Sequence, residues 1–276
     1  MKKDDRISIF LSPGELYCIA GSLGYPTLPL LNSYFQKIPV EELKLMLLEG
    51  LESLKNRSLI WDEGGKTMTD LTLRNLVEVI ARPQYTLGIL NISRADPPSH
   101  SFIFFKSGQS LAVTQKGRYF NLSLFRDRVA LKRTLDSWVG LGTQVSDKAK
   151  MIHLPSMDTA IKMMTMIWKE PNKVAQMFEA AGHNEKEVDE LIKVLTPCTF
   201  FSSLTRLNWD DNISTQVSRL LVFGNATTLW AQEVNQNNAI LPDFKPFHVS
   251  DLSVMLRKYT NLEFNEPVNT ADTQEI

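Results

Sequence analysis

Apolar residues recur at helical spacing in several stretches of the chain. The spacing is clearest over 185–195, where apolar residues at i, i+3, i+4 and i+7 share one helix face: Val188, Leu191, Ile192 and Leu195. Over 39–57, leucines at i, i+4, i+8 and i+11 predict a helix with one buried stripe: Leu43, Leu47, Leu51 and Leu54. Other helices are predicted over 13–24, 73–82, 127–138, 157–169, 171–181 and 248–259.

Two helices carry further expectations. Ser12 precedes Pro13 and lies three residues before Glu15, which is the pattern of a capping box at a helix start. In the helix over 127–138 we expect Val129, Leu135 and Trp138 to be buried.

After Pro83 the pattern changes from helical to extended. Strands are predicted over 85–92, 101–105 and 110–115, and in the second half over 200–209, 217–223 and 228–234. The connections within each set are short, which favours antiparallel meanders. A small separate hairpin is predicted over 58–69 around the turn Gly64-Gly65.

The two halves of the chain follow one plan of helices, a proline stop, strands and a long helix. Local matches support it: 76–83 with 191–197, 105–112 with 223–230, and 125–141 with 247–262. The alternative is that any two α+β halves align this well by chance. The prediction is an α+β fold of two quasi-repeated halves, each with helices and an antiparallel sheet of three or more strands. The two sheets could pair around a pseudo-twofold axis.

The segment 140–150 is polar and contains two glycines, and the expected linker between the two halves is its part 143–150. The predicted organisation is a first half over 1–142, a second half over 151–264 and a polar tail over 265–276.

Composition narrows the class of protein. The chain has 276 residues, of which 43% are apolar and 22% charged, and its formal net charge is -1. This balance excludes a disordered chain and argues against a general nucleic-acid binder, which needs a surplus of Lys and Arg. Residues 16–36 carry no charge but contain Pro26 and Pro29 together with two glycines, so no membrane span is predicted. Two cysteines fit a reducing compartment, and we expect a cytoplasmic protein.

The sequence contains no recognisable catalytic motif. Its four histidines are not spaced as metal pairs, and neither Cys18 nor Cys198 has a C-x-x-C partner. No glycine-rich phosphate loop is present. We therefore predict a protein that is not an enzyme and that uses no cofactor or metal. An enzyme whose site is assembled from scattered residues, such as Cys198 with a histidine, stays open as an alternative.

A second alternative is a transcription regulator with a winged-helix module. Residues 39–69 are predicted to form a helix followed by a hairpin, which is the order such a module needs. The helix carries four glutamates that would repel phosphate groups: Glu41, Glu42, Glu49 and Glu52. This module would therefore have a structural or protein-binding role.

Five methionines cluster at the start of the second half: Met157, Met163, Met164, Met166 and Met177. Methionine side chains are flexible and soft, and they are common on surfaces that bind varied partners. The cluster therefore suggests a binding groove, with core filling as the competing interpretation.

Three short segments resemble the opening of the EspG family: Leu-Ser-Pro-Gly-Glu-Leu at 11–16, Gly-Tyr-Pro-Thr-Leu-Pro-Leu at 24–30 and Leu-x-x-Arg-x-Leu-Ile at 54–60. The chain length and the duplicated helix-and-sheet plan are similar as well. The resemblance implies a cytosolic bacterial chaperone of type VII (ESX) secretion with an α+β body of quasi-twofold halves. Such a protein is not an enzyme and binds one end of a helical PE–PPE pair.

The resemblance also implies where the partner binds. It points to the sheet loop over 94–99 and to the helices of the second half, so the candidate partner-binding residues are Arg94, Asp96, Pro97, Pro98, Met163 and Met164. A rigid proline loop adds a contact at little ordering cost. The expected partner is a helical secreted protein, of the PE–PPE kind if the source makes them, and neither nucleic acid nor a membrane is expected.

Overall fold

The computed structural model describes residues 6–29, 35, 38–125, 127–138, 157–210, 213–225, 229–235, 245–246 and 254. The helices are α1 (Pro13–Ser22), α3 (Val40–Asn56), α4 (Leu71–Ala81), α5 (Arg128–Trp138), α6 (Met157–Met166), α7 (Pro171–Ala180) and α8 (Glu185–Leu195). The strands are β1 (Arg6–Leu11), β2 (Ile60–Glu63), β3 (Lys66–Thr69), β4 (Tyr85–Ser93), β5 (Ser99–Lys106), β6 (Gln109–Lys116), β7 (Tyr119–Phe125), β8 (Phe200–Asp210), β9 (Ile213–Gly224), β10 (Leu229–Asn235) and β11 (Lys245–Pro246).

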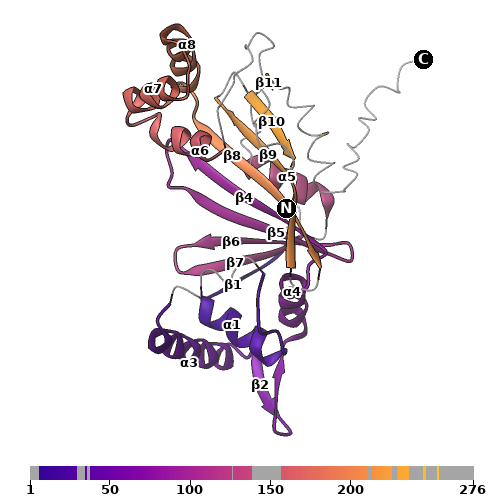
Figure 1. Cartoon of the computed structure of the whole chain (residues 1–276). Coiled ribbons are helices and arrows are strands. Elements are labelled where there is room, and N and C mark those ends of the chain that lie inside the picture. The colour runs from indigo at the N-terminus through magenta and orange to yellow at the C-terminus, as the bar shows by residue number, and fades with distance from the viewer. Residues whose placement is uncertain are drawn as a thin grey trace, which may run out of the picture.

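One nine-stranded antiparallel sheet runs through the molecule in the order β1-β7-β6-β5-β4-β8-β9-β10-β11. The pair β4–β8 joins strands from the two halves of the sequence into this sheet, as Figure 1 shows. Helices pack on the sheet, and β2 and β3 form a separate hairpin. The predicted α+β class with a large antiparallel sheet is therefore confirmed.

The strand order is symmetric about the pair β4–β8 except for the edge strand β1. From that pair outward, β5, β6, β7 and then β1 follow on one side and β9, β10 and β11 on the other. The matched segments 105–112 and 223–230 both span a turn between equivalent strands, β5–β6 and β9–β10. This order is the one that a pseudo-twofold axis between β4 and β8 would produce. The sequence repeat itself stays a prediction.

The sequence analysis missed three strands, β1, β7 and β11. Strand β1 pairs with β7 from Arg6↔Phe125 to Leu11↔Phe120 and extends the sheet by two strands beyond β6. The turn before β7 contains Gly117, whose φ of +60° suits a tight hairpin. The predicted linker 143–150 and tail 265–276 lie outside the described residues. So does the helix predicted over 248–259, apart from Val254.

The capping box at the start of α1 is confirmed. The Glu15 backbone N–H donates to Ser12 Oγ at 3.1 Å, and the Ser12 backbone N–H donates to Glu15 Oε2 at 2.6 Å. Helix α8 begins with the same arrangement between Asn184 and Glu187, at 3.0 and 3.1 Å. These bonds satisfy backbone donors that the first helical turn leaves without partners.

The sheet separates three buried clusters because successive side chains of a strand point to opposite faces. One face, which carries Leu87 and Ile89 of β4, packs against Leu131 and Leu135 of α5. On the opposite face two helical layers lie apart from each other. Figure 1 shows α1, α3 and α4 at one end of the sheet and α6, α7 and α8 at the other.

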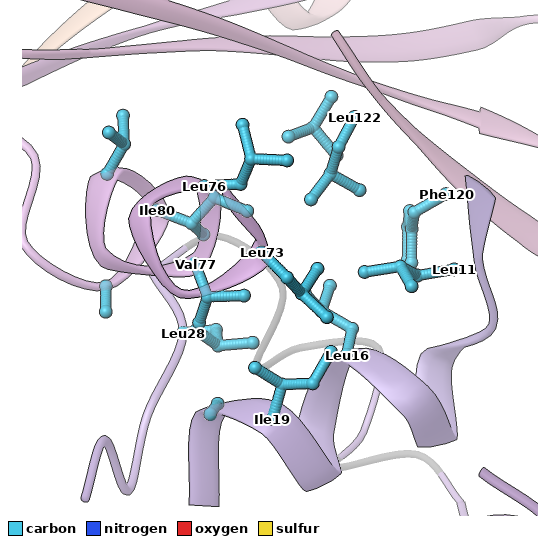
Figure 2. Packing of buried hydrophobic residues seen from close by; sticks show 14 of the residues in the cluster. Leu11, Leu16, Ile19, Leu28, Leu73, Leu76, Val77, Ile80, Phe120 and Leu122 are labelled. Carbon is cyan, nitrogen blue, oxygen red and sulfur yellow. The ribbon is translucent and has the colours of Figure 1, made fainter. Parts of the chain in front are cut away.

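The first helical layer is built on leucine and isoleucine contacts. Figure 2 shows side chains of α1 and α4, among them Leu16, Ile19 and Leu73, pointing toward one another and toward Phe120 and Leu122 of β7. Each of these side chains is buried. Burial of that kind contributes about 1.5–3 kcal/mol per large side chain and fixes the helices on the sheet.

Two burial predictions were wrong. In α3 only Leu54 of the expected stripe is fully buried, whereas Leu51 is exposed. Helix α3 approaches α1 most closely at Met46 and Gly50 rather than at Leu51, and Leu43 and Leu47 are half-buried. Val129 of α5 is also exposed, while Leu135 of the same helix is buried as expected.

Candidate functional site

A hollow of about 250 Å³ lies on the sheet face that carries the two helical layers. It is lined by four adjacent strands, β5, β4, β8 and β9, which form the middle of the sheet. The lining residues are Gly88, Ile89, Leu90, His100, Phe102, Ser203, Thr205, Leu207 and Arg219. Among the helices that the structure describes, none contributes a residue to the lining of the hollow.

Gly88 explains why the hollow exists. In the sheet it stands between Phe102 on β5 and Thr205 on β8. A Cβ atom at this position would lie 3.6 Å from the Phe102 ring, which is an ordinary contact distance. There is therefore room for a side chain here, and because residue 88 is glycine that room stays empty. A glycine inside a strand often marks a place where a ligand or another backbone approaches closely.

The opposite side of the hollow is polar. Arg219 of β9 faces Thr205 across the strand pair, and its Nε donates to Thr205 Oγ1 at 2.9 Å. Its Nη2 donates to Gln216 Oε1 at 3.1 Å. These bonds hold the guanidinium in a fixed orientation beside the hollow. The site therefore combines an apolar wall at Phe102 and Leu90 with a positive charge at the other side.

The predicted proline loop connects the two strands that carry the apolar wall. Ser93 orders it: its Oγ accepts the backbone N–H groups of Ala95 at 3.2 Å and Asp96 at 2.8 Å and donates to Asp96 Oδ2 at 3.3 Å. The Arg94 backbone N–H donates to the Thr199 carbonyl at 2.9 Å. Arg94, Asp96, Pro97 and Pro98 are all exposed, as the prediction requires.

The proline loop and the hollow lie close together. Leu90 and His100, which line the hollow, pair in register near the loop end of β4 and β5. The loop begins after Ser93, so at roughly 3.3 Å per residue it lies about 10 Å from this pair. A partner seated in the hollow could therefore reach the loop as well.

The two predicted methionine contacts are not on the surface. Met163 and Met164 of α6 are both 0% exposed. They belong to the buried cluster of the second helical layer, together with Ile92, Phe178 and Phe201. The prediction of a binding groove lined by these two methionines is therefore wrong. Both side chains fill the core instead. The structure thus exposes the loop residues and buries the two methionines.

The cysteines are held as thiols. Burial raises the pKa of Cys198 to about 12, and the residue is fully buried. Burial, followed by the nearby charge of Glu15, also raises the pKa of Cys18, whose Sγ donates to the Leu47 carbonyl at 3.2 Å. A cysteine nucleophile needs a lowered pKa, so neither side chain fits the enzyme alternative.

Other functional alternatives gain no support from the described residues. The part of the chain that the structure describes contains no group of three His, Cys, Asp or Glu side chains placed to hold a metal ion. Within the same ranges, no helix is both long and apolar enough to cross a membrane. Helix α3 of the supposed winged helix exposes glutamates such as Glu42 and Glu49, which would repel a phosphate backbone.

Comparison with known proteins gives a fold but no family. No protein-family model matches the chain, and no curated protein matches it. Among solved structures, the Mycobacterium tuberculosis type VII secretion system chaperone EspG5, in complex with the PE25–PPE41 dimer, is similar with a TM-score of 0.60. The match covers 95% of this chain and 99% of that one, at 10% sequence identity. The likeness establishes the fold, a mixed α+β body built on a large antiparallel sheet.

The sequence analysis found the loop but missed the hollow. The floor of the hollow depends on Gly88, and the only feature of the sequence that could have indicated it is a glycine inside an otherwise apolar strand. Arg219 could not be found at all, because its place in the hollow depends on the strand pairs β4–β8 and β8–β9. His100, which no motif in the sequence singled out, is exposed and lines the hollow.

Proposed function

We propose that this protein is a secretion chaperone that binds a helical secreted protein, of the same kind as the PE–PPE pair bound by EspG5. One observation carries the proposal: the fold likeness to that chaperone extends over 95% of the chain. The proposed role is binding rather than catalysis, and the proposed location is the cytoplasm.

The chemistry of the hollow supports such a partner. Its apolar wall at Phe102 and Leu90 suits a leucine or aromatic side chain at the end of a helix pair. Arg219 on the other side suits a carboxylate or the carbonyl oxygens at a helix C-terminus, where the helix dipole is negative. The proline loop Arg94–Pro98 is the proposed second contact, since it is exposed and held by Ser93.

A photo-crosslinking amino acid in place of Phe102 tests the proposal in cells of the source organism. The expected product is a covalent complex with a predominantly helical secreted protein, identified by mass spectrometry. The matched control carries the same amino acid in place of Ile213, which is exposed on β9 but does not line the hollow. Equal products at both positions, or a small metabolite bound in the hollow, would overturn the proposal.

A further inference from the structure

The residues that line the hollow follow a local twofold arrangement. One row of directly paired residues crosses its floor, with one member from each of β5, β4, β8 and β9: Phe102, Gly88, Thr205 and Arg219. Gly88 and Thr205 form the central pair of this row, and Phe102 and Arg219 flank it. A half-turn about an axis through the central pair, perpendicular to the sheet, therefore exchanges the two central strands and also exchanges the two flanks.

Two corners of the hollow obey the same rotation. Leu90 follows Gly88 by two residues on β4, and Leu207 follows Thr205 by two residues on β8. Because the two strands are antiparallel, these leucines lie toward opposite ends of the hollow. Three pairs of lining residues are thus related, and the members of each pair are the same number of positions apart in the sequence: Gly88 with Thr205, Leu90 with Leu207, and Phe102 with Arg219.

The chemistry of the two flanks breaks this symmetry. Phe102 presents an aromatic ring, whereas Arg219 at the equivalent position carries a positive charge. The two residues stand three strand spacings apart, or about 14 Å. Arg219 Nε donates to Thr205 Oγ1 at 2.9 Å, which holds the guanidinium beside the central pair. Gly88, the equivalent of Thr205, has no hydroxyl group, so only the β8–β9 side can hold an arginine in this way.

We propose that Phe102 and Arg219 fix the orientation in which the partner binds, an inference that rests on the proposed function. The strand register and the leucine corners repeat after a half-turn, so they do not distinguish between two orientations of a bound partner. The flanks do distinguish them. In the favoured orientation an apolar side chain of the partner meets Phe102, and a carboxylate or carbonyl oxygen meets Arg219.

The reversed orientation is weaker because it mismatches both flanks at once. It places the oxygen of the partner against the Phe102 ring and an apolar group against the Arg219 guanidinium. Each polar group then loses water without gaining a hydrogen-bond partner, and a charged group pays the larger penalty. Specificity is a difference between two binding free energies, and a mismatch of this kind contributes to it as much as a matched contact does.

The orientation decides which part of the partner reaches the proline loop. Leu90 lies at the end of the hollow next to that loop, since β4 leads directly into it, whereas Leu207 lies toward the other end. A half-turn of the partner would exchange the segments at these two ends. A single orientation therefore brings one defined segment of the partner to Arg94–Pro98.

Site-specific photo-crosslinking at Leu90 and at Leu207, in cells of the source organism, tests the orientation. The two positions are equivalent under the rotation, so any difference between them reports the flanks. The probe is the helical secreted protein captured at Phe102, and mass spectrometry maps the segment of it that each position captures. In the wild type, each position should capture its own segment with at least about a tenfold preference over the other segment.

Arg219→Met makes both flanks apolar and leaves an unbranched side chain. Both positions should then capture both segments, in amounts within about threefold of each other. Arg206→Met is the matched control, because that guanidinium lies 4.6 Å from the centre of the Tyr85 ring on the opposite face of the sheet. This control should keep the wild-type pattern, and melting curves verify that both variants are folded.

Phe102→Lys is a second, independent variant. It makes both flanks cationic and should abolish the preference as Arg219→Met does, so the inference stays testable if one of the two fails to fold. No cross-link at either leucine in the wild type would overturn the proposed function and the orientation with it. Capture of both segments at both positions in the wild type, or an unchanged preference in a folded flank variant, would overturn the orientation alone.

Discussion

At the scale of single residues, two glycines set the distance between α1 and α3. A Cβ atom at Gly14 would lie 2.1 Å from the Met46 carbonyl oxygen, and one at Gly50 would lie 2.5 Å from the Gly14 carbonyl carbon. Both obstacles are backbone atoms, which cannot rotate away as a side chain can. The close crossing of the two helices therefore requires glycine at both positions.

We predict that Gly14→Ala lowers the free energy of unfolding by about 2 kcal/mol, because the helices must separate to admit the methyl group. Chemical denaturation measures the change. Gly21→Ala in the same helix is the control, since nothing lies within 4 Å of its Cβ position. It should be neutral or add about 0.5 kcal/mol through helix propensity. Equal stability of the two variants would show that the crossing is not tight.

The Met163 side chain is buried in the cluster of the second helical layer, so its substitution should change stability rather than partner binding. Met163→Glu should lower the free energy of unfolding by roughly 3 kcal/mol or more, because the new carboxyl group has no partner in that cluster. Met68→Glu on the exposed face of β3 is the matched control and should change stability by about 0.5 kcal/mol or less. An unchanged melting temperature of the Met163 variant would contradict the burial of this side chain.

At the scale of elements, an ion pair connects α4 to the end of β5. Lys106 Nζ lies 2.6 Å from Glu78 Oε1. The hydrogen bond from Lys106, and then its charge, lower the pKa of Glu78 below its usual range. A lowered folded-state pKa stabilises the protein above the ordinary glutamate value of about 4.3, and that stabilisation is lost as the pH falls through the folded value.

We predict that Lys106→Met costs less than about 1 kcal/mol at neutral pH, because the Glu78 side chain is 41% exposed and solvent screens the pair. The difference in unfolding free energy between wild type and variant should disappear as the pH drops below about 4.3. Unfolding curves at a series of pH values measure it. A difference that persists in acid would assign the effect to lost packing of the lysine stem instead.

Helices and turns could be predicted from the sequence better than strands and burial. Helix α8 and the capping box at Ser12 are local patterns, and both are present as expected. Strand β1 was missed because six residues near the N-terminus become a strand only by pairing with β7, more than a hundred residues away. In the stripe predicted for α3, Leu54 is buried but Leu51 is exposed, because periodicity shows that leucines share a side, not whether anything covers each of them.

At the scale of the whole molecule, the symmetric sheet creates the candidate site. The pair β4–β8 joins the two halves, and the described helices of those halves pack on the two ends of one sheet face. The hollow over Gly88 lies between these helical layers. The proline loop was predictable because two consecutive prolines interrupt any strand. The hollow was not, because it requires residues of four strands to meet.

The affinity of the reconstituted complex for the helical partner tests the central claim most directly. Isothermal titration should give a one-to-one complex for the wild type. Gly88→Leu fills the floor of the hollow and should weaken binding at least about tenfold, or 1.4 kcal/mol, with an unchanged melting temperature. The control Ile213→Ala should bind as the wild type does. No complex, or full affinity in a folded Gly88→Leu variant, would contradict the account.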